Sequence, residues 1–171
     1  MSRQGWKNPL PSSQSDSIRL STYWAGCALD IMKYHHNKPC DMFEDIQATI
    51  LLGFFLLNVE GFSARLHSYL IVIVSRVRDL SLHNVDTKGS SKPRGPLDTE
   101  IKRRVWWHIV TTDWILSLPV GAQEGTYSVQ PRQMAVNVPS NIDDEDLNHT
   151  YPPINRPLSE PTAISNFFTA H

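Results

Sequence analysis

The sequence has 171 residues, 40% of them hydrophobic, and its 16 basic and 17 acidic residues leave a formal net charge of −1. This length suits one domain of ordinary size, and the balanced charge excludes a general attraction to nucleic acid or to anionic membranes. The two cysteines, Cys27 and Cys40, are too few for a zinc cluster or a disulfide framework, and free thiols suit a reducing compartment such as the cytosol or nucleus.

The N-terminal segment, residues 1–17, is rich in Ser, Pro and Gln and predicts a flexible lead-in. It lacks the apolar centre of a secretory signal. The longest apolar runs are ILLGFFLL (50–57) and YLIVIV (69–74). Both fall far short of the roughly 20 residues that span a bilayer. We therefore expect buried core segments and no membrane association.

The first predicted helix follows the lead-in, because apolar residues recur at spacings of three and four and form one stripe. Asn37 and Pro39 are expected to end it. The stripe consists of Leu20, Trp24, Cys27, Ile31 and Tyr34.

A second helix is predicted to open at Asp41, with Glu44 three residues on as in an acidic capping box. The run DIQATILLGFFLLN that follows is apolar on nearly every face. A helix of this kind is expected to be buried on all sides. Asn58 and Gly61 are expected to stop it.

A third helix is predicted to start with Ser63 as its cap. Its apolar residues again fall at helical spacing over about four turns. The β-branched run IVIV leaves a strand as the alternative, but the helical stripe and its polar flanks favour a helix. The stripe consists of Leu66, Leu70, Ile73, Val77 and Leu80.

Residues 83–96 predict a loop by their Gly, Ser, Pro and Lys content. Asp98 is then expected to cap a fourth helix, with Glu100 in its first turn and Pro119 and Gly121 at its end. No face of this helix is plainly polar after the first turn. We therefore expect the helix to be enclosed by the rest of the protein.

From residue 122 onward the composition predicts irregular chain with short extended pieces such as MAVNV (134–138). The acidic run at residues 143–146 is interpreted as a solvated turn. Another helix is expected to begin near Thr162 and to carry Phe167 and Phe168, with no following partner to bury them. The predicted fold is all-α: a bundle-like array of antiparallel helices with an irregular C-terminal tail.

The sequence predicts no catalytic, cofactor-binding or metal-binding residue, and no cofactor. None of its seven histidines lies in a metal-ligand spacing such as H-E-x-x-H. G-x-S-x-G, P-loop and G-x-G-x-x-G motifs are absent. We therefore do not expect an enzyme.

A basic triplet, Lys102, Arg103 and Arg104, occupies the start of the fourth helix. It could contact DNA phosphates, but a solvated patch or salt bridges are favoured. Cations are unfavourable at a helix N-terminus, which indicates that acidic neighbours offset them. The nearby loop cations also lack the interleaved aromatic residues that stack on bases.

Asp113 interrupts the apolar part of the same helix and shares a face with Trp106, Val110 and Ser117. A buried carboxylate there must be paired, hydrogen-bonded or neutralised. We predict a structural anchor that binds a basic group or backbone donors of another segment. A ligand-sensing acid in a cavity is the alternative. The candidate basic partners are Arg65, Arg76 and Arg132.

The stretch RRVWWHIVTTDWILSLPVG (103–121) resembles a signature of the middle homology region of fungal zinc-cluster transcription factors, the fungal-specific transcription factor domain. Three flanking stretches agree with it in order: IQATILLGFFLLN (46–58), VRDLSLHNVD (77–86) and VNVPSNIDDEDL (136–147). Two residues depart from the family pattern, because Trp114 replaces a customary Arg and Pro119 lies where the helix would continue. The matching positions are Arg103, Arg104, Trp106, Trp107, Asp113, Leu116, Ser117 and Gly121.

The resemblance implies an α-helical, nuclear region that modulates RNA polymerase II transcription, with residues 18–171 forming a partial domain of this family. The six-cysteine DNA-binding cluster of the family is missing from the sequence, so direct specific DNA binding is not expected. Other parts of a transcription factor, or regulatory proteins, are the expected partners, and a small-molecule effector is possible. The alternative is a helical small-molecule-binding domain or an enzyme with an unrecognised site.

Overall fold

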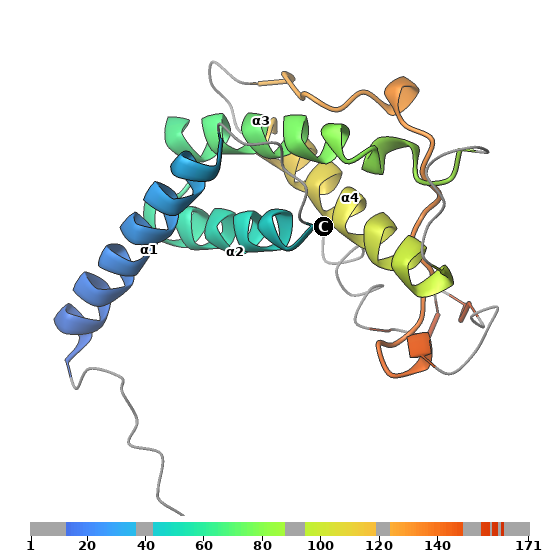
Figure 1. The fold of residues 1–171 in the computed structure, drawn as a ribbon, viewed down its shortest axis with the longest axis horizontal. Helices are drawn as coiled ribbons and strands as arrows, with labels where there is room; N and C mark the ends of the chain where they lie inside the picture. Colours follow the sequence, from blue (N-terminus) through green and yellow to red (C-terminus); the bar gives the residue numbers. More distant parts are fainter. Residues whose placement is uncertain are drawn as a thin grey trace, which may run out of the picture. The chain divides into compact units, whose positions relative to one another are not determined.

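The computed structural model is built from helices. It describes residues 13–36, 43–87, 95–118, 124–148, 155–157, 159–160 and 162. No strand occurs within these ranges, so the all-α prediction is confirmed (Figure 1). The long helices are α1 (Gln14–His36), α2 (Phe43–Glu60), α3 (Ala64–Asp79) and α4 (Pro96–Leu116). Three short 3-10 helices follow α3 and α4: η1 (Leu82–Asn84), η2 (Pro131–Gln133) and η3 (Asp146–Asn148).

The chain divides into two compact units, residues 1–39 and residues 40–171. The first unit contains α1, which starts at Gln14 and so begins inside the expected lead-in. Ser13 supports this start, because its hydroxyl accepts a hydrogen bond from the backbone N–H of Asp16 at 3.1 Å. The predicted division of the chain at residue 17 stays a prediction.

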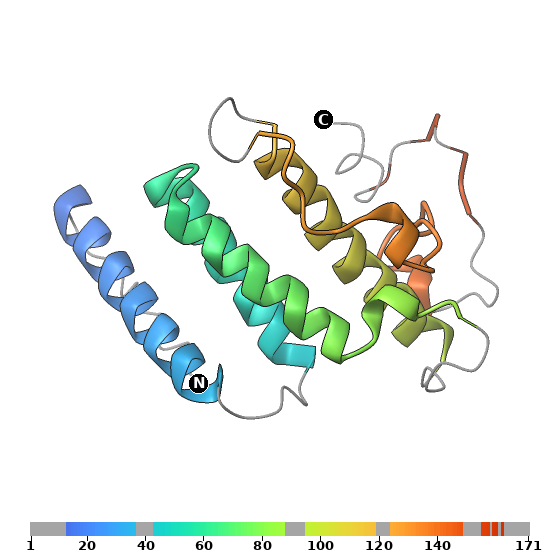
Figure 2. The same ribbon diagram turned by 90° about the horizontal axis from the view of Figure 1, so that it is seen from above.

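Helices α2 and α3 form an antiparallel hairpin within the second unit (Figure 2). Gly61 ends α2 in the left-handed conformation, with φ of 65°, and its N–H donates to the carbonyl of Leu57 at 3.0 Å. Ser63 then caps α3 by accepting from the N–H of Leu66 at 3.1 Å. The predictions for Gly61 and Ser63 are confirmed, whereas Asn58, also expected to stop the second helix, lies inside α2, and Asp41, its expected start, lies outside the described residues.

Ser63→Ala is expected to lower the free energy of unfolding by about 1 kcal/mol, because the N–H of Leu66 loses its acceptor. Urea unfolding of the purified chain measures this change. Ser68→Ala is the control, because Ser68 is exposed inside the same helix. Its effect should stay within about 0.5 kcal/mol. Equal effects of the two substitutions would contradict the capping role of Ser63.

The prediction that the second helix is buried on all sides is wrong. Ile46 and Leu56 are buried, but Leu51 is 69% exposed and Phe54 is 44% exposed. Helix α2 packs on α3 through one stripe, so part of its apolar surface faces outward. An apolar run shows that a helix has much surface to bury, but the number of packing partners decides how much is buried.

The YLIVIV run lies inside α3, so the helical interpretation is confirmed over the strand. Helix α4 packs against α3 and η1. It begins at Pro96, with Gly95 at its N-cap position, so the prediction that Asp98 caps it is wrong. Proline suits the first helical position because it needs no N–H acceptor, and Asp98 falls in the first turn instead. The predicted end residues Pro119 and Gly121 lie outside the described residues.

The core of the second unit lies where α2, α3 and α4 meet. No residue of α4 after Leu97 is classed as exposed, which confirms that this helix is enclosed. Trp106 is fully buried at its centre. The buried core residues are Ile46, Leu56, Leu66, Leu70, Ile73, Val74, Val77, Leu82, Trp106, Ile109, Val110, Leu116 and Val129.

Candidate functional site

Residues 126–142 lie along α3 and α4 and form no regular secondary structure apart from η2 (Figure 2). We call residues 126–142 the strap. Two tryptophan side chains of α4 hold its backbone, because Nε1 of Trp107 donates to the carbonyl of Asn137 at 2.9 Å and Nε1 of Trp114 donates to that of Val129 at 3.0 Å. Nε1 of the buried Trp106 lies 3.4 Å from Sδ of Met134. The tryptophans thus bind the strap through their ring nitrogens as well as through their apolar surface.

Asp113 is a structural anchor for the strap. Its side chain is buried, and Oδ2 accepts hydrogen bonds from the backbone N–H groups of Ser128 and Val129, both at 2.8 Å. Backbone donors therefore hold this carboxylate, and the predicted ion pair with Arg65, Arg76 or Arg132 is wrong. Arg65 instead binds Glu60 at 2.8 Å. Two N–H dipoles stabilise a buried carboxylate without requiring the desolvation of a second charge.

Two further carboxylates hold the strap in the same way. Oδ2 of Asp86 accepts from the N–H of Asn137 at 2.7 Å, and Oε1 of the buried Glu100 accepts from that of Ser140 at 2.8 Å. Together with Asp113, three acids from α4 and the turn after α3 bind backbone donors spread over the strap. These acids therefore position the strap through its main chain, while strap side chains such as the buried Val129 add apolar packing.

The three cations of the basic triplet are paired with acidic side chains. Lys102 binds Asp98 at 2.8 Å, and Nε of Arg103 donates to Oδ2 of Asp86 at 2.9 Å. Arg104 binds Glu100 at 3.2 Å, and its guanidinium also donates to the strap carbonyl of Ile142 at 3.1 Å. The salt-bridge interpretation of the triplet is confirmed. The three cations are therefore paired with acids, of which Glu100 is buried, and are not presented as a free basic patch.

Burial raises the pKa of Asp86, but hydrogen bonds from Arg103 and the backbone of Asn137, with the charge of Arg103, outweigh it. The net result is a pKa below the ordinary value. The hydrogen bond to Asp86 in turn raises the pKa of Arg103. Both groups are therefore charged at neutral pH, and the pair that joins the turn after α3 to α4 is intact there.

Asn141 organises the chain beyond the strap, and no sequence pattern singled it out. Its side-chain amide donates to the carbonyls of Arg156, Pro157 and Glu160 at 3.1–3.2 Å. Its Oδ1 accepts from the hydroxyl of Thr162 at 2.5 Å, and both Asn141 and Thr162 are buried. One amide thus gathers three carbonyls from a segment 15 to 19 residues away in the sequence.

The acidic run at residues 143–146 is only partly a solvated turn. Arg156 binds Asp143 at 2.9 Å and Asp146 at 2.6 Å, and Arg104 binds Asp144 at 2.5 Å. These acids therefore connect α4 to the C-terminal segment. Thr162, the expected start of a last helix, donates its hydroxyl to Asn141, and the residues after it, including Phe167 and Phe168, lie outside the described residues.

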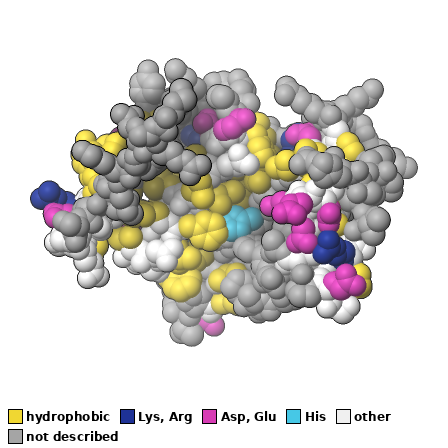
Figure 3. Space-filling view, turned by 90° about the horizontal axis from the view of Figure 1, so that it is seen from below, with side chains coloured by type: hydrophobic (Ala, Val, Ile, Leu, Met, Phe, Trp, Pro, Cys, Tyr) yellow, Lys and Arg dark blue, Asp and Glu magenta, His cyan; other side chains and the backbone are white. Residues whose placement is uncertain are grey.

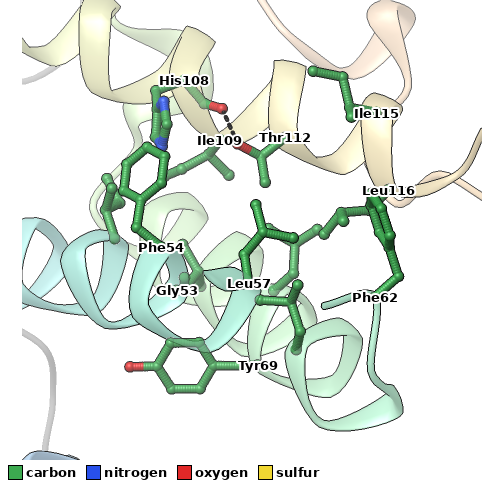
Figure 4. A pocket seen from close by; sticks show the side chains of 14 residues that line it. Gly53, Phe54, Leu57, Phe62, Tyr69, His108, Ile109, Thr112, Ile115 and Leu116 are labelled. Atoms are coloured by element: carbon green, nitrogen blue, oxygen red, sulfur yellow. Dashed lines mark hydrogen bonds between the residues drawn. The ribbon is translucent and has the colours of Figure 1, made fainter. Parts of the chain in front are cut away.

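Another face of α4, which carries Ile109 and Thr112, lines an apolar cavity of about 160 Å³ between α2, α3 and α4 (Figure 4). Ile109, Thr112 and Leu116 contribute from α4, and Gly53 and Leu57 face them from α2. Glycine inside a helix is about 0.5–1 kcal/mol less stable than alanine. Gly53 therefore leaves the cavity open at some cost in stability. The complete lining is Ile50, Gly53, Phe54, Leu57, Phe62, Leu66, Tyr69, Leu70, Ile73, His108, Ile109, Thr112, Ile115 and Leu116.

His108 lies at the edge of this cavity, with its ring centroid 5.0 Å from that of Phe54. Burial lowers the pKa of His108, so its imidazole is neutral at neutral pH. Burial and the charge of Arg78 likewise lower the pKa of His83, which packs near Trp106.

Lowering the pH from 7.5 to 5.5 is expected to destabilise the protein. The unfolded chain takes up protons on His83 and His108 near their ordinary pKa of about 6.5, whereas the folded protein resists this until the pH is lower. Stability is therefore full above the unfolded pKa and falls as the pH decreases through it. His108→Gln should reduce the loss, as measured by urea unfolding at both pH values. An unchanged loss would show that His108 does not contribute.

The described ranges contain no group of three or more side chains able to hold a metal ion. No helix within them is long and apolar enough to cross a membrane.

The signature helix and two of the three flanking stretches meet at one place in the structure. Asp86 comes from VRDLSLHNVD, Arg103 from the signature, and Asn137 from VNVPSNIDDEDL, and the three are joined by hydrogen bonds. A family model described as "Fungal specific transcription factor domain" matches residues 4–170. The chain belongs to this family. Its members are transcription factors, so the prediction that the chain is not an enzyme is confirmed.

Three fungal proteins illustrate the relationship. The "Probable transcription factor lepB" of Aspergillus flavus is 43% identical over 160 residues, which is 90% of this chain and 28% of that protein. "Transcription factor TAS2" of Pyricularia oryzae is 32% identical over 95% of this chain and 22% of its own length. The "Agnestins biosynthesis cluster transcription factor AgnL11" of Paecilomyces divaricatus is 34% identical over 86% of this chain and 23% of its own length.

The chain thus spans about a quarter of the length of these curated relatives and corresponds to the middle region of a fungal transcription factor. No solved structure matches it significantly. The site residues that the sequence patterns missed are Glu100, as a strap ligand, and Asn141. Glu100 was recognised only as an acid in the first helical turn, and Asn141 lies in a stretch that matches the family.

Proposed function

We propose that this chain is a regulatory and interaction region of a fungal transcription factor, which modulates RNA polymerase II transcription in the nucleus. Its partners are other parts of the transcription factor or separate regulatory proteins. Membership of the fungal-specific transcription factor domain family and the printed names of the three relatives support this proposal.

The observation that carries the proposal is the internal use of the basic signature residues. Arg103 binds Asp86, and Arg104 binds the buried Glu100 and the strap carbonyl of Ile142, so the signature helix holds a scaffold together. A DNA-reading helix presents its cations to phosphates instead. A scaffold with a net charge of −1 is suited to contacts with proteins or small effectors.

A reporter assay in a fungal host tests the regulatory role. The chain is placed between an unrelated DNA-binding domain and an activation domain, and reporter output is compared with that of the same fusion without the chain. We expect at least a threefold change, lost in Asp113→Ala and kept in Asp144→Ala. Equal output from the two fusions at matched protein levels would contradict the proposal.

The purified chain is expected to bind duplex DNA only weakly, with micromolar or weaker affinity at physiological salt, and to lose this binding as salt rises. Fluorescence anisotropy with labelled duplexes measures it. Nanomolar, sequence-selective binding that survives a chelator would show a direct DNA-reading function instead.

A further inference from the structure

The cavity between α2, α3 and α4 has the features of a ligand site, and the packing of the three helices does not require these features. Its volume is about 160 Å³, and engineered apolar cavities of about 150 Å³ stay dry and bind benzene. Phe54 and Phe62 line it and are 44% and 63% exposed, so part of its wall reaches the surface. On one face of the molecule, hydrophobic side chains gather beside a histidine (Figure 3).

Gly53 is an independent sign that the space is kept open. It lies inside α2 without a positive φ, so its backbone conformation does not require glycine. A Cβ atom added there would meet nothing within 4 Å, which means that alanine would fit. The helix would be more stable with alanine. Glycine at this position leaves space in the cavity that a larger side chain on α2 would occupy.

The lining determines the chemical class of the ligand. None of the lining residues is Asp, Glu, Lys or Arg. Burial lowers the pKa of His108 and raises that of Tyr69 to about 12, so both are neutral at pH 7. A carboxylate, phosphate or ammonium group would lose its hydration there without gaining an opposite charge. The hydroxyl of Thr112 donates to the carbonyl of His108 at 2.8 Å and is therefore already used within α4 (Figure 4).

We propose that this cavity binds a neutral, mainly apolar small molecule of about one to two fused rings. The ligand lies between Gly53 of α2 and Thr112 of α4, with its apolar body on the aliphatic side chains of α3. This proposal rests on the proposed regulatory function and adds a ligand that acts as its effector. Helix α4 connects the two, because it lines the cavity and also holds the strap.

The test uses indole as a neutral probe and indole-3-carboxylate as its charged counterpart, with the 171-residue chain at pH 7.5. Indole is expected to raise the melting temperature saturably, as a ligand of the folded state does, and to bind at least tenfold more tightly than the carboxylate. Gly53→Leu fills the cavity from α2 and should weaken indole binding at least tenfold without lowering the melting temperature of the free protein.

Gly26→Leu is the matched control, because Gly26 also lies in a helix, α1, with nothing within 4 Å of an added Cβ. It should leave indole binding unchanged. Indole binding that is absent, equal to that of the carboxylate, or insensitive to Gly53→Leu would overturn the proposal. A protein side chain as the true occupant would give one of these results. If the reporter still responds to the chain in that case, only the ligand proposal fails and the regulatory proposal stands.

Discussion

Asp113→Ala is expected to lower the free energy of unfolding by about 3–5 kcal/mol. The substitution leaves the N–H groups of Ser128 and Val129 without their acceptor, and a hydrogen bond to a charged group contributes about 1.5–3 kcal/mol. Total stabilities of about 5–15 kcal/mol make this a large fraction. Thermal unfolding should show a decrease in melting temperature on the order of 10 °C.

Two companion substitutions separate the possible reasons for this loss. Asp113→Asn keeps an oxygen that can accept both N–H groups, so it should be clearly milder than Asp113→Ala. An ion-pair anchor would instead be lost with either change. Asp144→Ala is the control, because that side chain is 80% exposed and should change stability by less than about 1 kcal/mol. If Asp113→Ala is as mild as Asp144→Ala, the anchor is misassigned and a functional role for the acid becomes the better explanation.

Glu100→Ala is the second substitution with a large expected effect, again about 3–5 kcal/mol. Glu100 is 2% exposed and lies 3.2 Å from the guanidinium of Arg104, and its removal leaves Arg104 with only the exposed Asp144 as an acidic partner. The N–H and hydroxyl of Ser140 also lose their acceptor. Denaturant unfolding measures the loss of stability.

Hydrogen exchange would show which backbone amides lose protection when Glu100 is substituted. The amide of Ser140 should exchange faster in Glu100→Gln, while amides in the middle of α3 keep their protection. Glu145→Ala is the control, because Glu145 is exposed, and its effect should stay within about 0.5 kcal/mol. A Ser140 amide that is unprotected already in the unsubstituted protein would contradict the geometry of the strap.

Both substitutions act on one arrangement, in which α4 separates the strap from the cavity. The strap binds the face with Asp113 and Trp114, and the cavity lies against the face with Ile109 and Thr112. A ligand in the cavity would therefore contact the helix that positions the strap. An effector bound in the cavity would thereby act on the helix that positions the strap.

Local sequence signals were sufficient for the helices and for several of their ends. Ser63 marked the start of α3 because a hydroxyl can accept from the free N–H groups of a first turn, and Gly61 marked the end of α2 because it tolerates a positive φ. The lack of a polar face on α4 predicted its enclosure. The signature around Trp106, Trp107 and Asp113 was enough to indicate the family.

Only the tertiary structure decided what holds Asp113 and how far α2 is covered. The sequence favoured an arginine as the partner of Asp113, because a charged side chain can be identified from the sequence. The actual partners are backbone N–H groups of Ser128 and Val129, which every residue except proline carries, so no residue type announces them. Asp86 and Asn137 likewise meet across 51 positions only after α3 and α4 have packed. The cavity beside Gly53 also depends on that packing, because its walls come from three separate helices.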